Sequence, residues 1–337
     1  MTSVAVIGQG FVGGSLTTVL SERGLTVYTY DKTGKRVEGS SIPIDYKGDV
    51  TSISNLIDRC ETVENRETNF SGIYFVCLPT PMKMDGSCDL SIVDGALEEL
   101  ASVSGERIAV IKSTVTPGSV DNWNKKFVDK GLYVVFCPEF LTEANALNDM
   151  RNQDRIILGG PRPWINKVKE LFMLAFPQVP IHKTSAVNAE MVKYMINNFL
   201  AVKVSFANEI YQVCEKLLET GQDIDYDRIV ELATLDKRLG NSHWKVPGPM
   251  PADDGTGRLL PGFAGSCFVK DLNSLIFLSK QLGVDPKVLS AAWQKNLEVR
   301  PERDWEKLKG RAVSQIEDNK NVGEQLQFDF IVPEKKS

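Results

Sequence analysis

Short apolar runs and amphipathic segments alternate along the first half of the chain. Val4–Ile7 is apolar at every position, as expected of a parallel strand that is buried on both faces. Similar runs predict five further strands, separated by helical patterns such as Val93–Ala101; the runs are Thr26–Tyr30, Ile73–Leu78, Ile108–Ile111, Tyr133–Cys137 and Arg155–Leu158. This alternation predicts an α/β fold with a doubly wound parallel sheet.

The pattern changes after His182, where helical periodicity replaces the strands. One helix is expected to run from Ser185 or Asn188 to Glu219, which is about 45 Å at about 1.5 Å per residue. Its middle part, Met191–Val213, is apolar on nearly every face, which predicts burial between domains or subunits. Shorter helices are expected at Asp225–Asp236, Phe268–Gln281 and Val288–Val299, followed by a charged tail with one edge strand at Phe328–Val332.

Three polar residues interrupt one face of this long apolar helix: Lys193, Asn197 and Asn208. A buried lysine is strongly destabilising unless it has a partner. Two explanations are open at this point. A bound ligand could supply an oxyanion or a carboxylate, or the protein could supply an internal salt bridge, for example with Glu190.

A glycine-rich turn joins the first predicted strand to the helix expected at Ser15–Arg23. The turn, Gly8-Gln9-Gly10-Phe11-Val12-Gly13, has the G-x-G-x-x-G pattern in the strand–turn–helix context of dinucleotide-binding proteins. Asp31 follows the second strand, where a carboxylate holds a ribose hydroxyl and opposes the 2′-phosphate of NADP. These residues predict a Rossmann-type domain that binds NAD.

The stretch Arg258–Leu275 carries the strongest candidate for covalent chemistry. Two glycines bracket a tight turn, and Cys267 then falls at the start of a helix, with Lys270 and Asp271 just beyond it. A helix N-terminus and a neighbouring lysine both favour the thiolate, the nucleophilic form of cysteine. Asp271 is placed to hold a water or accept a proton. The alternative is a small buried cysteine beside a surface Lys–Asp pair.

Polar residues also follow the ends of the predicted strands, the edge at which such sheets bind ligands. They are Thr80, Thr114, Glu139 and Glu143. Each has a structural alternative, because a threonine can cap a helix and a glutamate can be solvated. Cys77 and Cys137 lie inside apolar strands, and we expect both to belong to the core.

The composition narrows the class of protein. The 337 residues are 42% hydrophobic and 25% charged, with a net charge of −5 and no basic stretch interleaved with aromatics, which argues against nucleic-acid binding. We find no signal-peptide pattern, no apolar run of membrane-spanning length, no C-x-x-C pair and too few histidines for a zinc site. We therefore expect a cytoplasmic protein with reduced thiols, no metal and no membrane contact.

Six motifs, in order along the chain, resemble the UDP-glucose/GDP-mannose dehydrogenase family. They are the glycine turn, L-P-T-P at Leu78–Pro81, K-S-T-V-T-P-G at Lys112–Gly118, P-E-F-L-T-E at Pro138–Glu143, E-M-V-K-Y-M-I-N-N-F-L-A at Glu190–Ala201 and G-F-A-G-S-C-F-V-K-D at Gly262–Asp271. The N-F-L-A run looks more like the UDP-glucose branch. The resemblance implies an NAD-binding domain over residues 1–184, an all-helical dimerisation and catalytic domain over 185–301 and a short tail over 302–337.

The resemblance also implies an activity, the four-electron oxidation by NAD of the C6 alcohol of a nucleotide sugar, with UDP-glucose favoured. Cys267 would carry the thiohemiacetal and thioester, Lys193 and Asn197 would stabilise the oxyanion, and Asp271 with Thr114 or Glu143 would organise water. The implied NAD-binding residues are Gly8, Gly10, Phe11, Val12, Gly13, Asp31, Lys32, Pro79, Thr80, Thr114 and Lys270. The implied substrate-binding residues are Glu139, Phe140, Leu141, Lys193, Asn197, Arg258, Phe263 and Gly265.

The sequence departs from the family pattern in four places. Ala264 and Val269 stand where glycine and proline are usual, and Gly39–Asp49 matches poorly. In addition, too few residues follow the central helices to build the family's third domain, which binds the nucleotide. We expect either that the loop Leu239–Gly257, with Trp244, Lys245 and the adjacent Arg258, and the tail after Glu302 hold the nucleotide, or that a partner protein is needed.

Two other classes of protein remain open. A two-electron β-hydroxyacid dehydrogenase has a similar architecture but gives Cys267 no role. A catalytically reduced NAD-binding partner subunit would keep the cofactor and the long helix. Such a decayed site should have lost residues that this chain retains, namely Lys193, Asn197, Cys267 and Asp271. The family resemblance favours an active enzyme. The apolar stripes of the long helix, with Phe199, Val202, Phe206 and Ile210, exceed what one small domain needs to cover, which predicts a homodimer built on Glu190–Glu219 and the helix after Cys267.

Overall fold

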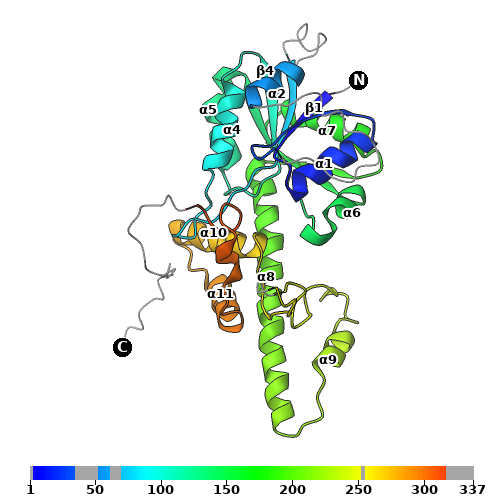
Figure 1. The fold of residues 1–337 in the computed structure, drawn as a ribbon, viewed down its shortest axis with the longest axis vertical. Helices are drawn as coiled ribbons and strands as arrows, with labels where there is room; N and C mark the ends of the chain where they lie inside the picture. The colour runs from blue at the N-terminus through cyan, green and yellow to red at the C-terminus, as the bar shows by residue number, and fades with distance from the viewer. Residues whose placement is uncertain (1–2, 35–51, 61–69, 252–254, 316–337) are drawn as a thin grey trace. The chain divides into compact units, whose positions relative to one another are not determined.

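The computed structural model describes residues 3–34, 52–60, 70–251 and 255–315, and the chain forms two compact units (Figure 1). The first unit comprises residues 1–80 and 90–193, and the second comprises residues 81–89 and 194–337. The division falls inside one long helix, between Lys193 and Tyr194. The segment Gly39–Asp49 and the expected edge strand at Phe328–Val332 lie outside the described residues.

The first unit is organised around a sheet in which the described residues form seven strands, in the order β2-β1-β3-β4-β5-β6-β7. The strands are β1 (Ser3–Ile7), β2 (Thr26–Tyr30), β3 (Phe70–Val76), β4 (Glu106–Ile111), β5 (Leu132–Phe136), β6 (Ile156–Gly159) and β7 (Ile181–Thr184). The strands β2 to β5 in this order pair in parallel, which confirms the predicted sheet. β6 runs antiparallel to β5, so the sheet is mostly rather than wholly parallel. An apolar run buried on both faces predicts a strand but not its direction.

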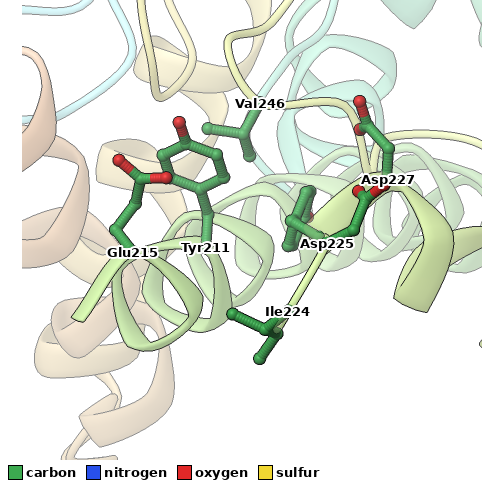
Figure 2. Close-up of a pocket in the computed structure, with 7 residues that line it drawn as sticks. Tyr211, Glu215, Ile224, Asp225, Asp227 and Val246 are labelled. Atoms are coloured by element: carbon green, nitrogen blue, oxygen red, sulfur yellow. The ribbon is translucent and has the colours of Figure 1, made fainter. Parts of the chain in front are cut away.

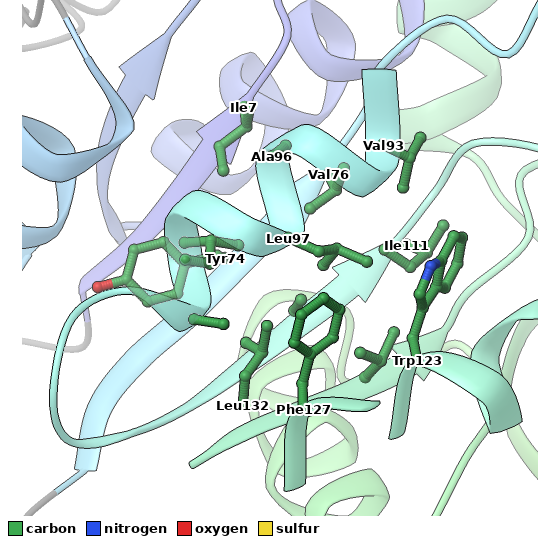
Figure 3. Packing of buried hydrophobic residues seen from close by; sticks show 14 of the residues in the cluster. Ile7, Tyr74, Val76, Val93, Ala96, Leu97, Ile111, Trp123, Phe127 and Leu132 are labelled. Atoms are coloured by element: carbon green, nitrogen blue, oxygen red, sulfur yellow. The ribbon is translucent and has the colours of Figure 1, made fainter. Parts of the chain in front are cut away.

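Helices cover both faces of this sheet, as a doubly wound fold requires. One face packs against α2 (Ile53–Cys60), α4 (Ser91–Ala101), α5 (Ser119–Phe127) and the start of α8 (Ala186–Glu219), around a core that includes Leu97, Trp123 and Phe127 (Figure 3). The other face packs against α1 (Phe11–Glu22), α6 (Ala146–Arg151) and α7 (Trp164–Ala175). Two single turns, η1 (Val128–Lys130) and η2 (Glu143–Asn145), complete this unit.

The second unit is helical in its described part. It contains the rest of α8 together with α9 (Tyr226–Ala233), α10 (Cys267–Gln281), α11 (Lys287–Val299) and the turn η3 (Asp304–Lys307). One apolar cluster joins α8, α10, α11 and η3 around Phe263, Trp293 and Trp305. A smaller cluster joins α8 to α9 around Cys214 and Tyr226. The all-helical second unit that the periodicity predicts is thus present.

Part of the apolar surface of α8 is not covered within the single chain, and the predicted burial between subunits stays a prediction. In the single chain, Met195 is 72% exposed, Phe199 66% and Phe206 52%. Large apolar side chains on a helix normally face a core, so a helix with such residues exposed has an unpartnered face. No helix in the described part of the chain is both long enough and apolar enough to cross a membrane.

Candidate active site

The glycine turn after β1 fits the pyrophosphate of a dinucleotide. A Cβ atom at Gly13 would lie 1.9 Å from the carbonyl oxygen of Gly8, so the turn and α1 pack too closely for any side chain there. At Gly10, by contrast, an added Cβ would meet no atom within 4 Å, which leaves the N-terminus of α1 open. The backbone amides of a helix N-terminus bind phosphate groups. The half-buried Phe11 and Val12 begin this helix.

Asp31, directly after β2, is hydrogen-bonded to this glycine turn. Its carboxylate accepts hydrogen bonds from the backbone N–H of Gln9 (2.7 Å) and of Thr33 (2.9 Å), and from the Thr33 hydroxyl (2.6 Å). The glycine turn is therefore tied to the residue that is predicted to distinguish the ribose hydroxyl of NAD from the 2′-phosphate of NADP. Lys32 is exposed beside it. The link through Gln9 was not predicted, because the variable positions of the glycine motif carry no signal for it.

The ends of β3 and β4 are held together by two side chains. The Ser113 hydroxyl donates to the carbonyl of Leu78 (2.6 Å), and the Thr80 hydroxyl donates to the carbonyl of Thr114 (2.7 Å). Thr80 and Thr114 are buried and Pro79 is exposed. The structure therefore brings Thr80 and Thr114 together at the edge of the sheet where ligands bind. Ser113 was not among the predicted site residues, although it lies within the K-S-T motif.

Lys193 has a partner inside the first unit. Its ammonium donates to the backbone carbonyl of Glu139 (2.7 Å) and forms a salt bridge with the Glu139 carboxylate (3.0 Å), and both side chains are buried. The alternative of an internal salt bridge is thus correct for Lys193. The suggested partner, Glu190, is wrong, because the Glu190 carboxylate instead accepts hydrogen bonds from the backbone amides of Gly118 and Val120.

The P-E-F-L-T-E loop after β5 contains Glu139 and makes further contacts with this ion pair. The Leu141 backbone amide donates to Glu139 (2.8 Å). Two cations lie near the Phe140 ring, with the Arg155 guanidinium 4.5 Å and the Lys193 ammonium 5.7 Å from its centroid. Both distances are within the range of cation–π attraction. Glu143 lies two residues past Leu141 at the start of η2 and is exposed.

In the second unit, Cys267 is the first residue of α10, as the pattern predicts, and it is half-buried. Asp271, one turn later, is 1% exposed and accepts hydrogen bonds from Asn197 (2.6 Å) and from Lys270 (2.5 Å). Burial lowers the pKa of Lys270, but Asp271, Cys88 and Cys267 raise it by more, so the net pKa lies above its usual value. A retained ammonium group beside a thiol favours the thiolate.

Two further thiols, those of Cys77 and Cys137, directly follow β3 and β5. Burial raises the pKa of Cys77 to about 12 and also raises that of Cys137, in spite of the nearby Lys112 ammonium. Both pack with the core of the first unit, as predicted, and neither has the character of a nucleophile.

The turn before Cys267 is held by buried amides. Asn296 accepts from the Phe263 backbone amide (2.7 Å) and donates to its carbonyl (3.0 Å). Asn208 on α8 accepts from the Gly262 backbone amide (3.1 Å). Gly265 has a φ of +72°, a conformation that favours glycine. These bonds fix the approach of the chain to α10, and Asn208 therefore supports the turn rather than a ligand.

Of the remaining candidates for nucleotide binding, Lys245 is exposed, whereas Arg258 and Trp244 contact other side chains of the second unit. The exposed Arg258 forms a 3.3 Å ion pair with Glu302. The half-buried Trp244 ring packs edge-on against Phe206 and lies under the Lys203 ammonium at 4.6 Å. Figure 2 shows a separate pocket of about 420 Å³ in the second unit; its lining includes Tyr211, Glu215 and Asp227 but none of the predicted site residues.

The fold and the glycine turn define a Rossmann-type dinucleotide-binding protein whose second, helical unit presents a cysteine at a helix N-terminus. Residues 2–174 match the sequence profile of the NAD-binding domain of the UDP-glucose/GDP-mannose dehydrogenase family, and residues 187–298 match that of its central domain. The chain therefore belongs to the UDP-glucose/GDP-mannose dehydrogenase family, and its first unit carries the family's NAD-binding domain.

Individual relatives agree with this assignment. The chain is 31% identical to a UDP-glucose 6-dehydrogenase of Bacillus subtilis, over 89% of this chain and 64% of that protein. It is 29% identical to a UDP-glucose 6-dehydrogenase of Haloferax volcanii, over 91% of this chain and 72% of that protein. A UDP-glucose dehydrogenase structure from Pyrobaculum islandicum superposes with a TM-score of 0.68 at 26% identity, covering 90% of this chain and 69% of that one. The chain thus spans about two thirds of the length of these relatives.

Proposed function

We propose that this protein oxidises the C6 alcohol of a nucleotide sugar to a carboxylate with two molecules of NAD, and that the sugar is UDP-glucose. The observation that supports this most directly is Cys267, the first residue of α10, with the Lys270–Asp271–Asn197 group beside it. A two-electron alcohol oxidation needs no nucleophile, whereas oxidation of an aldehyde to an acid proceeds readily through a thiohemiacetal.

The proposed reaction balances as one alcohol, two NAD and one water giving one carboxylic acid, two NADH and two protons. NAD, when bound at the glycine turn, accepts the electron pair in each oxidation. Between the two oxidations the Cys267 sulfur bonds to the aldehyde carbon and the aldehyde oxygen takes up a proton. After the second oxidation, water attacks the thioester carbon and the carbon–sulfur bond breaks, which returns the thiolate.

The side chains of both units have roles in this proposal. Asn197, oriented by its 2.6 Å bond to Asp271, donates a hydrogen bond to the oxygen that becomes negatively charged. In the first unit, Lys193, held by Glu139, is proposed to provide positive charge for oxyanion stabilisation. Asp271, Thr114 and Glu143 organise the water and accept protons. The loop from Glu139 to Leu141 in the first unit, and Arg258, Phe263 and Gly265 in the second unit, are each proposed separately as contacts for the nucleotide sugar.

The choice of UDP-glucose rests on the names of the relatives, which are UDP-glucose 6-dehydrogenases. The test is to incubate the protein with NAD and a panel of nucleotide sugars that includes UDP-glucose, GDP-mannose and UDP-N-acetylmannosamine, and to follow NADH absorbance. The proposal predicts the highest kcat/KM for UDP-glucose. No NADH from any member of the panel would refute the activity, and a higher value for another sugar would refute the choice of substrate.

A further inference from the structure

Glu190 is the most deeply buried carboxylate of α8, and the reaction proposed above gives it no role. Its side chain is 0% exposed, and it lies one turn before Lys193 in the part of α8 that belongs to the first unit. Its two oxygens accept hydrogen bonds from backbone amides of a distant segment, Gly118 at 2.6 Å and Val120 at 3.0 Å. A buried carboxylate is costly unless such bonds compensate it.

These two amides belong to the N-terminus of α5, which has no cap of its own. The residue that precedes α5 is Gly118, whose φ of +95° requires glycine and which offers no side chain to accept from the first turn. The Glu190 carboxylate therefore takes the place of a cap and also lies at the positive end of the helix dipole. The capping group comes from α8, 72 residues away in sequence.

Thr114 lies at the other end of the loop that leads into α5. At that end, Thr114 is bonded to Thr80 through its carbonyl, and Ser113 is bonded to Leu78. The loop from Thr114 to Gly118 is thus anchored twice, once to the end of β3 and once to Glu190. One helical turn further along α8, Lys193 anchors the next loop through Glu139.

We infer that Glu190 is a positioning residue, which fixes the Thr114 loop against the same helix that carries Lys193. This inference rests on the proposed function, because it assumes that Thr114 and Lys193 act on the substrate. The pKa of Glu190 is raised to about 6. Burial is the largest cause and the nearby Asp121 also raises the pKa, whereas the two amide hydrogen bonds lower it. The carboxylate is therefore mainly ionised at neutral pH and can accept both bonds.

The test compares Glu190→Gln with a matched control, Asp94→Asn. Asp94 on α4 also anchors α5, through a 2.7 Å bond from the Trp123 indole, but it holds the middle of the helix rather than the Thr114 loop. We expect Glu190→Gln to lower kcat by about 10- to 100-fold, because small displacements of reacting groups have effects of this size. Because Thr114 is also an expected NAD contact, the dissociation constant of NAD should rise in Glu190→Gln as well, whereas in Asp94→Asn it should stay at the wild-type value.

Hydrogen exchange of the backbone provides a readout that does not depend on activity. In Glu190→Gln the peptide covering residues 112–120 should exchange faster than in wild type, and in Asp94→Asn it should not. Glu190→Asp keeps the charge on a shorter side chain and should recover part of both properties; it also replaces Glu190→Gln if the latter does not fold. Unchanged exchange over residues 112–120, or a kcat no lower than that of Asp94→Asn, would overturn the inference. A wild-type protein that makes no NADH refutes the proposed function instead, and exchange alone then decides whether Glu190 holds the loop.

Discussion

Asp271 is a buried carboxylate rather than a solvent-exposed base. It is 1% exposed, and both of its oxygens accept hydrogen bonds, one from Asn197 and the other from Lys270. The two hydrogen bonds link the Asp271 carboxylate to both of these side chains. In the proposed reaction its first effect is therefore to orient Asn197 and to retain the positive charge of Lys270 near Cys267.

The first prediction at the residue scale concerns the nucleophile. Cys267→Ser should bind NAD like wild type but form no acid product, because a serine hydroxyl without an adjacent base is a poor nucleophile at neutral pH. Wild-type protein quenched during turnover should carry a sugar adduct on the peptide that contains Cys267, visible by mass spectrometry. Acid product at the wild-type rate from the serine variant would rule out the covalent mechanism.

The second prediction concerns the choice of cofactor. Asp31 already accepts three hydrogen bonds at the end of β2, so its charge is fixed in place where a 2′-phosphate would lie. We expect a strong preference for NAD over NADP in kcat/KM. In Asp31→Asn this preference should fall by about tenfold, equivalent to about 1.4 kcal/mol, through loss of the repulsive charge. Equal kcat/KM for the two cofactors in wild type would contradict this account.

At the scale of single elements, Arg107 closes the C-terminus of α4. It is 0% exposed and donates to the carbonyls of Leu100 (2.8 Å), Val103 and Ser104 (2.5 Å). Cations are favoured at the C-terminal end of a helix, where the last carbonyls lack partners within the helix. The guanidinium thus takes the place of a C-cap in the core of the first unit.

We predict that Arg107→Leu lowers the free energy of unfolding by about 3 kcal/mol, because it removes a buried guanidinium that donates to three carbonyls, of which that of Leu100 is buried. Lys126→Ala, which removes an exposed pair with Glu98, is the control and should cost less than about 1 kcal/mol. Urea unfolding followed by circular dichroism measures both. A loss as small as that of the control would show that Arg107 contributes little as a cap.

Elements such as α2 and β7 were not predicted from the sequence, and the reasons differ. α2 has buried Ile53, Leu56 and Ile57, a helical spacing that an amphipathic pattern search would detect. β7 is a short edge strand, I-H-K-T, in which His182 and Lys183 are exposed, so it lacks the apolar run of an inner strand. The glycine turn and the start of α10 were predictable because each depends on adjacent residues.

The partners within the site were less accessible to sequence reasoning. The pairs Lys193–Glu139 and Glu190–Gly118 join residues 54 and 72 positions apart, and a single sequence holds no information on which distant residues meet. Local rules indicated that Lys193 needs a partner. They assigned that partner to Glu190, which lies close in sequence, whereas the fold places Glu139 there.

At the scale of the whole molecule, the exposed face of α8 predicts association. Phe199 and Phe206 are each more than half exposed, and the half-buried Val202 and Ile210 continue the apolar surface along the helix. Exposed apolar surface of this kind on a helix is typical of interfaces in obligate dimers. We propose that the protein is a homodimer built on α8 and α10.

Light scattering at micromolar concentration should give about twice the 37.4 kDa chain mass for wild type. The double variant Phe199→Asp/Phe206→Asp should shift towards the monomer, because two buried charges would be uncompensated in the interface. Met173→Asp, at an exposed apolar position on α7 in the first unit, is the control and should leave the mass unchanged. A monomeric mass for the wild-type protein would contradict the proposed assembly.

The central claim, a four-electron oxidation through Cys267, is tested most directly by the number of NADH molecules formed for each UDP-glucose consumed. The measurement uses limiting UDP-glucose and excess NAD, run to completion, with the acid product quantified in parallel. The covalent mechanism predicts two NADH and one UDP-glucuronate for each UDP-glucose. One NADH for each sugar, with an aldehyde as the product, would contradict it and would indicate a two-electron dehydrogenase in which Cys267 has no chemical role.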